Sequence, residues 1–246
     1  MKARRLLATA SRVLAQLRHD KPSIALIVMV PIMLEVILKF MYLHNSAMFN
    51  KVGAPMLGIF PLVMMFVVAS VATLRERTRG TLDRLLVTPI NKAEFVLGYA
   101  IAFTIMAIIQ AILVSAVALY LLNLHVAGPQ PLVVLICILD GILGMAMGLF
   151  VSAYAKTEFH SVQFLPAVIM PQFLLCGLLL PREQMAHWLY RLSEILPLTY
   201  GVEALQLIAQ KASPAGTFFW RDSVVVASFV IASLLLGAAS IRRKTA

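Results

Sequence analysis

The sequence alternates long apolar stretches with short polar segments. A bilayer core about 30 Å thick is crossed by about 20 apolar residues in a helix. Because several stretches reach that length, the pattern predicts an all-α polytopic membrane protein, with residues 1–246 forming a single transmembrane domain. The six expected spans are residues 23–43, 55–74, 95–123, 132–153, 161–180 and 223–240.

The segments outside these spans differ in their expected relation to the membrane. Residues 1–20 alternate leucines with arginines, which predicts an amphipathic helix in the interface; a solvated basic terminus is the alternative. Residues 44–54 are expected to be a short outer loop. Residues 181–221 are too apolar for a free loop, and we expect two short re-entrant helices in the outer leaflet, joined at Pro197.

Composition supports a membrane protein and orients it. The chain is 61% hydrophobic and 13% charged, with a mean hydropathy of +0.91, which excludes an ordinary soluble domain. The net charge of +10 would suit nucleic acid, but lysine and arginine retained on the cytoplasmic side are the commoner cause in membrane proteins. Most of these residues fall with the two termini and residues 75–94, which are therefore placed in the cytoplasm. Two cysteines in apolar stretches favour neither a disulfide framework nor a metal site.

A few polar residues interrupt the spans. Glu35 and Lys39 are four residues apart, so they are either a polar point on a transport path or a mutually neutralised pair. Asp140 is the single acid of its span and is expected to be protonated, paired or hydrated. The amide of Gln110, near the middle of the third span, is expected to find a partner on another helix.

Residues 75–94 are the most charged stretch between two long apolar blocks. Within them, Leu82, Leu85 and Leu86 share one face of a short helix that we expect to end before Thr88-Pro89. The order of residues in this segment is distinctive: it runs Arg75-Glu76-Arg77, then Gly80-Thr81-Leu82-Asp83, with Arg84, then Leu85-Leu86 and Thr88-Pro89. A generic basic loop explains the arginines but not this order.

A second distinctive pattern lies more than a hundred residues later. It consists of Pro181, Trp188, Pro197, Thr199, Tyr200 and Glu203. Both patterns, in this order, resemble the ABC-2-type permeases, the membrane subunits of one class of ATP-binding-cassette exporters. The sequence departs from that family at Leu196, where many relatives have asparagine.

The resemblance implies a function and a set of partners. The chain contains no phosphate-binding loop, so it is not expected to be an enzyme by itself. ATP and Mg²⁺ would be bound by a separate cytoplasmic ATPase subunit, present in two copies, and two permease copies, a homodimer, would form the path. Residues 75–94 would be the cytoplasmic coupling loop, with its short helix docked on the ATPase. The complex would lie in the cytoplasmic (inner) membrane, surrounded by lipid.

The same resemblance places the substrate route between the first, second and fifth spans. Candidate lining residues are Met29, Met33, Glu35, Phe60 and Met64, although packing against lipid or core is the alternative for each. The expected cargo is a hydrophobic or amphipathic drug or lipid-like molecule. A polysaccharide or glycolipid exporter and an ion-coupled secondary transporter, using Glu35, Lys39 and Asp140, remain alternatives.

Overall fold

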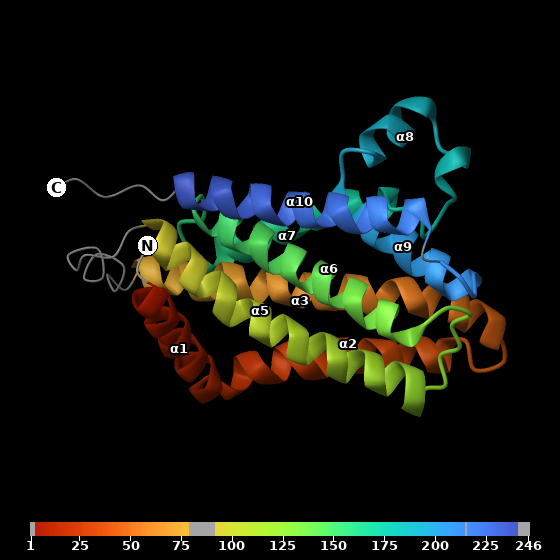
Figure 1. Cartoon of the computed structure of the whole chain (residues 1–246), viewed down its shortest axis with the longest axis horizontal. Helices are drawn as coiled ribbons and strands as arrows, with labels where there is room; N and C mark the ends of the chain where they lie inside the picture. Colours follow the sequence, from red (N-terminus) through yellow and green to blue (C-terminus); the bar gives the residue numbers. More distant parts are fainter. Residues whose placement is uncertain (1–2, 79–91, 215, 241–246) are drawn as a thin grey trace.

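The computed structural model describes residues 3–78, 92–214 and 216–240, and all regular secondary structure in these ranges is helical. The long helices run lengthwise side by side (Figure 1). Their bounds are α1 Ala3–His19, α2 Lys21–Met41, α3 Ser46–Thr78, α5 Lys92–Ala116, α6 Gln130–Ser152, α7 Glu158–Leu175, α8 His187–Ser193, α9 Pro197–Gln210 and α10 Thr217–Ser240. A π-helical turn, Val117–Leu121, continues α5, and a 3₁₀ turn, Arg182–Gln184, precedes α8.

Five helices among the described residues are long and apolar enough to cross a membrane. These candidate spans are Lys21–Met41, Ser46–Thr78, Glu94–Leu121, Gln130–Ser152 and Phe219–Ser240. The fifth expected span, residues 161–180, is not among them. Its helix, α7, carries Gln163 and Gln172 as well as Pro166 and Pro171, and it already ends at Leu175.

After α6 the chain nevertheless runs back along the bundle before α10 begins, and α7 is part of this returning segment. The hydroxyl of Tyr154, just after α6, lies 3.2 Å from Oγ of Ser240 at the end of α10. The ends of α6 and α10 are therefore at the same end of the bundle, where α1 also begins (Figure 1). Because α10 has 24 residues and is roughly 36 Å long, the chain between these helices has to travel back to the opposite end.

The expected outer loop at residues 44–54 is wrong. Helix α3 begins at Ser46 and continues for 33 residues, about 50 Å, to Thr78. Asn45 starts it, because its side-chain oxygen accepts a hydrogen bond from the backbone N–H of Met48 at 3.0 Å. Pro55 lies inside this helix, although a proline at the edge of an apolar stretch suggests a boundary. The first residues of the expected coupling loop, 75–78, are also helical.

Helix α1 lies at one end of the bundle (Figure 1). Its amphipathic pattern is used for packing, since Val13 and Leu17 are buried while Ser11 and Arg18 are exposed. The face carrying the buried residues contacts α5. The interfacial location of α1 stays a prediction.

Helices α3 and α6 form the most extensive helix–helix contact of the described chain. A Cβ atom added to Gly144 of α6 would overlap the backbone carbonyl of Leu62 in α3, and one added to Gly148 would overlap that of Phe66. The glycines thus allow the two backbones to touch directly, as the small-residue spacing in α6 leads one to expect.

A hydrogen bond between helices compensates for a proline in α2. Pro31 has no N–H, so the carbonyl of Ile27, four residues earlier, loses its helical donor. The side-chain Nε2 of Gln110, in α5, donates to that carbonyl at 2.7 Å, and Gln110 is fully buried. The expectation that Gln110 finds a partner on another helix is confirmed.

We predict that Gly144→Ala destabilises the protein and that Gly237→Ala does not. Overpacking costs about 1–3 kcal/mol, more than the gain of up to about 1 kcal/mol from replacing a helical glycine by alanine. At Gly237 in α10 the added Cβ would meet Cα of Phe150 at 3.5 Å, an ordinary contact, so only the gain remains. Thermal unfolding in one detergent measures both variants, and an unchanged or higher Tm for Gly144→Ala would contradict the packing.

We also predict that the cost of Gln110→Leu depends on Pro31. In the native background the variant leaves the Ile27 carbonyl without a donor and lowers the free energy of unfolding by about 1 kcal/mol. In a Pro31→Ala background the backbone N–H of residue 31 supplies the donor, so the same change costs less. A double-mutant cycle of unfolding free energies measures this coupling. Equal costs in the two backgrounds would show that the bond does not serve the proline.

Candidate functional site

The Arg-Glu-Arg sequence at residues 75–77 anchors the C-terminal end of α3 to several other helices. Arg75 donates from Nε and Nη2 to the two carboxylate oxygens of Glu158, at 2.8 and 2.9 Å. Its Nη1 lies 3.8 Å from Oδ2 of Asp20, between α1 and α2. A bidentate arginine–carboxylate pair fixes orientation as well as distance. Arg75 therefore holds α3 against the start of α7.

The next two residues make different connections. Glu76 is buried and receives a hydrogen bond from Nη1 of Arg12 at 3.4 Å, while Nη2 of the same guanidinium donates to the Tyr99 hydroxyl at 3.1 Å. Arg77 donates to the backbone carbonyl of Ser152, the last residue of α6. Carbonyls at a helix end lack intrahelical donors, so this arginine satisfies one of them. The three residues together join α3 to α1, α6 and α7, and Arg12 of α1 extends the connection to Tyr99 of α5.

This anchored helix end leads directly into the expected coupling loop. Gly80, Thr81, Leu82, Asp83, Arg84, Leu85, Leu86, Thr88 and Pro89 lie outside the described residues. The chain is described again from Lys92, where α5 begins, and Glu94 near that start is buried. The structure therefore shows which contacts hold the end of α3, where the chain leaves this helix after Thr78. The docking role of the loop stays a prediction.

A small apolar cavity of about 240 Å³ lies between α2, α3 and α7, the helices of the first, second and fifth expected spans. Phe60 and Met64 line it, together with residues of the same character: Leu34, Ile59, Val63, Ile169, Met170 and Phe173. Among the residues that the structure describes, no polar side chain lines it. Met29 and Met33, in contrast, lie on the outer face of α2, where they are more than half exposed. The structure thus separates the candidate path residues into two groups.

Glu35 faces the interior of the bundle. It is fully buried, and neither of its carboxylate oxygens has a hydrogen-bond partner among the described residues. Lys39 does not pair with it: Nζ of Lys39 lies 4.6 Å from the centre of the Phe49 ring. The neutralised Glu35–Lys39 pair suggested by their spacing is therefore wrong. The aromatic face of Phe49 attracts the ammonium group by a cation–π interaction instead.

Asp140 is also fully buried, and its carboxylate oxygens have no hydrogen-bond partner in the described part of the chain. Its oxygens lie against the backbone of Gly58 in α3 and of Gly201 in α9, where a Cβ on either glycine would overlap them. The carboxyl group thus occupies space that two glycines leave open between three helices. The sequence showed the acid, but it did not show that these distant glycines surround it.

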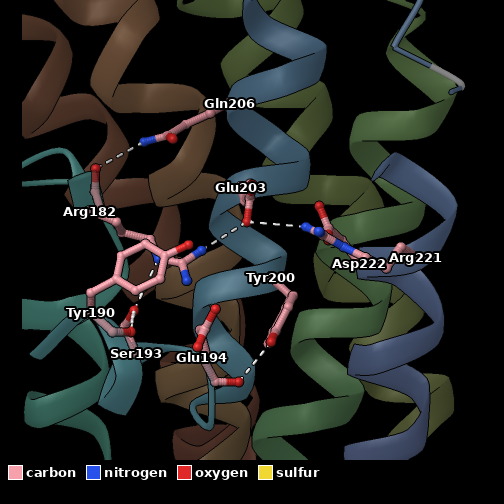
Figure 2. Close-up of polar contacts among 10 residues, drawn as sticks. Arg182, Tyr190, Ser193, Glu194, Tyr200, Glu203, Gln206, Arg221 and Asp222 are labelled. Atoms are coloured by element: carbon pink, nitrogen blue, oxygen red, sulfur yellow. Dashed lines mark hydrogen bonds and ion pairs between the residues drawn. The ribbon is translucent and has the colours of Figure 1, made fainter. Parts of the chain in front are cut away.

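The region expected on the outer side, residues 181–221, is held together by an arginine that the sequence motif does not include (Figure 2). Arg182 donates from Nη1 to Oε2 of Glu203 at 3.1 Å and from Nε to the hydroxyl of Ser193 at 3.0 Å. Its guanidinium also lies 5.0 Å from the centre of the Tyr190 ring. Arg182 therefore ties α8 to Glu203 of α9.

Glu203 also connects α9 to α10. Nη2 of Arg221 lies 3.6 Å from the same Oε2 of Glu203 and 2.7 Å from Oδ1 of the buried Asp222 (Figure 2). In α9, the Tyr200 hydroxyl donates to the backbone carbonyl of Glu194 at 2.7 Å. Burial raises the pKa of Tyr200 above its ordinary value. One carboxylate thus joins two arginines from different segments.

The remaining residues of the outer motif have mainly local roles. Pro181 precedes the 3₁₀ turn, and Pro197 is the first residue of α9, where a proline costs no hydrogen bond. Thr199 is buried, and its hydroxyl has no partner among the residues described. Trp188 is 67% exposed on α8, which projects from the bundle (Figure 1).

Comparison with known proteins identifies the class. Residues 4–209 match the family described as ABC-2 type transporter, so the chain belongs to this family and the class predicted from the two motifs is confirmed. ABC transporter G family member 20 of Dictyostelium discoideum is 25% identical over 203 residues, 81% of this chain and 28% of that protein. Probable multidrug ABC transporter permease YbhR of Escherichia coli (strain K12) is 28% identical over 156 residues, 63% of this chain and 42% of the relative. The chain spans less than half the length of these relatives.

We predict that Glu203→Gln loosens the outer region, whereas Glu194→Gln does not. The first change weakens two ion pairs of Glu203, with Arg182 and with Arg221. The second affects one pair with Arg191, which is 67% exposed. Since a partly exposed pair contributes at most about 1 kcal/mol, amide exchange in α8 should rise about fivefold to tenfold in Glu203→Gln. Hydrogen–deuterium exchange measures it, and equal exchange in both variants would contradict the role of Glu203.

Proposed function

We propose that this chain is the permease subunit of an ABC exporter that moves a hydrophobic or amphipathic molecule, a drug or a lipid-like compound, outward across the cytoplasmic membrane. A separate cytoplasmic subunit would bind ATP and Mg²⁺ and hydrolyse the ATP. One observation carries the proposal: a single helix, α3, contributes the wall of the apolar cavity and ends in the anchored Arg75-Glu76-Arg77 segment. The same helix therefore connects the expected substrate route to the expected ATPase contact.

The length of α3 supports this coupling. Met64 in the cavity wall and Arg75 at the anchored end are separated by eleven residues, about 16 Å along a helix. A displacement imposed on residues 79–91 by closure of the ATPases would pass along α3 as a rigid-body shift. The ion pairs of Arg75 with Glu158 and of Arg12 with Glu76 would carry it to α7 and α1.

The complete transporter would contain two permease copies and two ATPase subunits. Each permease would have six spans, α7 being the fifth, with both termini in the cytoplasm. The return of the chain along the bundle between Tyr154 and Thr217 supports this count. The region from Pro181 to Arg221 would lie in the outer leaflet and cap the path, with Glu203 holding it closed.

The cavity supports an apolar cargo. The described residues that line it carry no polar side chain, so a polysaccharide would lose its hydrogen bonds to water without replacement. The printed name of YbhR, a probable multidrug permease, points in the same direction. Buried Glu35 and Asp140, without hydrogen-bond partners among the described residues, favour a second candidate, an ion-coupled transporter.

We predict that Val63→Trp abolishes transport of hydrophobic dyes without abolishing basal ATP hydrolysis. Indole fills the cavity between α2, α3 and α7, whereas the matched Val224→Trp adds the same bulk to the exposed face of α10. The chain and its cytoplasmic ATPase are reconstituted in liposomes, and dye transport and phosphate release are measured together. We expect dye transport to be at least about tenfold lower in Val63→Trp and unchanged in Val224→Trp. A free-energy cost of about 1.4 kcal/mol on the transport step already lowers its rate tenfold.

The same liposomes separate the two candidates. An ABC exporter requires the ATPase, and Leu85→Asp or Arg84→Glu in the coupling segment should remove transport while the chain remains inserted. Transport that continues without ATPase and follows an imposed ion gradient would overturn the proposal in favour of the ion-coupled candidate. Transport of dye by Val63→Trp at the native rate would refute the cavity as the route.

A further inference from the structure

Asp140 is a buried acid to which ATP-driven transport assigns no role. It lies near the middle of α6 and is fully buried. Its Oδ2 lies against the backbone of Gly58 in α3, and its Oδ1 lies against that of Gly201 in α9. Leu205 of α9 packs against Gly58 as well. Three helices therefore meet at this one carboxyl group.

The surroundings of Asp140 offer no counter-charge. The buried thiols of Cys137, in the preceding turn of α6, and of Cys176, just after α7, interact with it electrostatically. Asp140 has no hydrogen bond or ion pair with any described residue. An ionised carboxylate would therefore be far more costly here than the neutral acid.

The other titratable side chains on the helices that contact α6 have partners of their own or lie toward the helix ends. They are Lys51, Arg75, Glu76 and Arg77 of α3, Lys92, Glu94 and Tyr99 of α5, Glu158 and His160 of α7, Tyr200 and Glu203 of α9, and Arg221 and Asp222 of α10.

Pro61 leaves a hydrogen-bond acceptor next to this carboxyl group. Proline has no N–H, so the helix supplies no donor to the carbonyl of Leu57, four residues earlier in α3. Leu57 is fully buried and directly precedes Gly58, against which Oδ2 of Asp140 lies. A protonated carboxyl group carries one O–H donor, whereas a carboxylate can only accept. The neutral acid thus offers the group that this part of α3 lacks, as a side-chain amide does at the proline of α2.

We propose that Asp140 is a proton-binding site that controls the position of α9. With the proton bound, the carboxyl O–H donates to the Leu57 carbonyl, and the neutral group stays between α3, α6 and α9. When α9 moves away, water reaches the carboxyl group, the O–H bond breaks, the proton passes to water and the carboxylate is hydrated. The packed arrangement holds one proton more than the open one, so a rise of one pH unit favours the open one by up to about tenfold. The proposal depends neither on the cargo nor on the source of energy for transport.

The test compares the pH dependence of α9 in the full chain, held in nanodiscs. Hydrogen–deuterium exchange is measured at several pH values for the wild type and for Asp140→Asn, whose amide still donates to the carbonyl but does not ionise. Relative to Asp140→Asn at the same pH, exchange in α9 of the wild type should rise with pH, by up to about tenfold per unit. Glu35→Gln removes the other buried acid without a partner among the described residues and should keep this pH dependence. The same pH dependence in the wild type and in Asp140→Asn overturns the proposal.

A second measurement tests the site even if Asp140→Asn fails to fold. In Glu35→Gln, infrared spectroscopy follows the C=O stretch of protonated carboxyl groups as the pH is raised. This signal should decrease over the range of pH in which α9 exchange, corrected for its chemical rate, increases, because the same proton is lost. A signal that stays constant, or α9 exchange that does not follow it, overturns the proposal.

The acceptor is tested by restoring the donor that Pro61 lacks. Asp140→Leu cannot donate, so exchange in α9 should be about fivefold faster than in Asp140→Asn, the ratio that one neutral hydrogen bond provides. In a Pro61→Ala background the backbone N–H of residue 61 supplies a donor to the Leu57 carbonyl, and the difference between the two variants should shrink. An equal difference in both backgrounds excludes the Leu57 carbonyl as the acceptor and overturns the proposed site.

Discussion

The direct contact between the backbones of α3 and α6 is the constraint on which the arrangement of the other helices depends. In a bilayer, apolar side chains gain little by leaving lipid for protein, so association requires close packing and hydrogen bonds. Gly144 and Gly148 provide the close packing by letting the carbonyls of Leu62 and Phe66 approach. With α3 fixed in this way, α2, α7 and α9 pack on its remaining surface. Helix α3, which has the most extensive contacts in the described chain, therefore carries both the cavity wall and the anchored Arg75-Glu76-Arg77 segment.

Some buried polar groups in this bundle have a hydrogen-bond partner, and others have none among the described residues. The carbonyl freed by Pro31 is satisfied by Gln110, as an apolar environment demands. Glu35 and Asp140 are equally buried but lack such partners in the described chain. Burying a carboxylate without a partner costs far more free energy when the group is ionised than when it is protonated. Both groups therefore fit this arrangement of helices as neutral acids. Packing against Gly58 and Gly201 makes Asp140 sensitive to any movement of α3 or α9.

Much of this architecture was predictable from local sequence. The apolar stretches predicted five long helices correctly, because burial in lipid depends on length and composition alone. The loop at residues 44–54 was wrong because Pro55 reads as a boundary, whereas Asn45 starts the helix earlier. The Glu35–Lys39 pair was wrong because Phe49, on another helix, attracts Lys39. Glu158, 83 residues from Arg75, could not be identified as its partner, since contacts between distant segments leave no trace in spacing.

The distribution of charged contacts along α3 and α9 bears on how the bundle can move. At the C-terminal end of α3 the connections of this helix diverge to α1, α6 and α7, so no single neighbour can shift without the others. At the opposite end of the bundle, ion pairs of Glu203 with Arg182 and with Arg221 join α8, α9 and α10. Hydrogen bonds add to these contacts at α9, because the backbone N–H of Leu198 donates to the side chain of Gln172 and the backbone N–H of Gly128 donates to the carbonyl of Ile208. Both ends of the bundle are therefore held by contacts between separate segments, and a movement of α3 would have to shift α1, α6 and α7 with it.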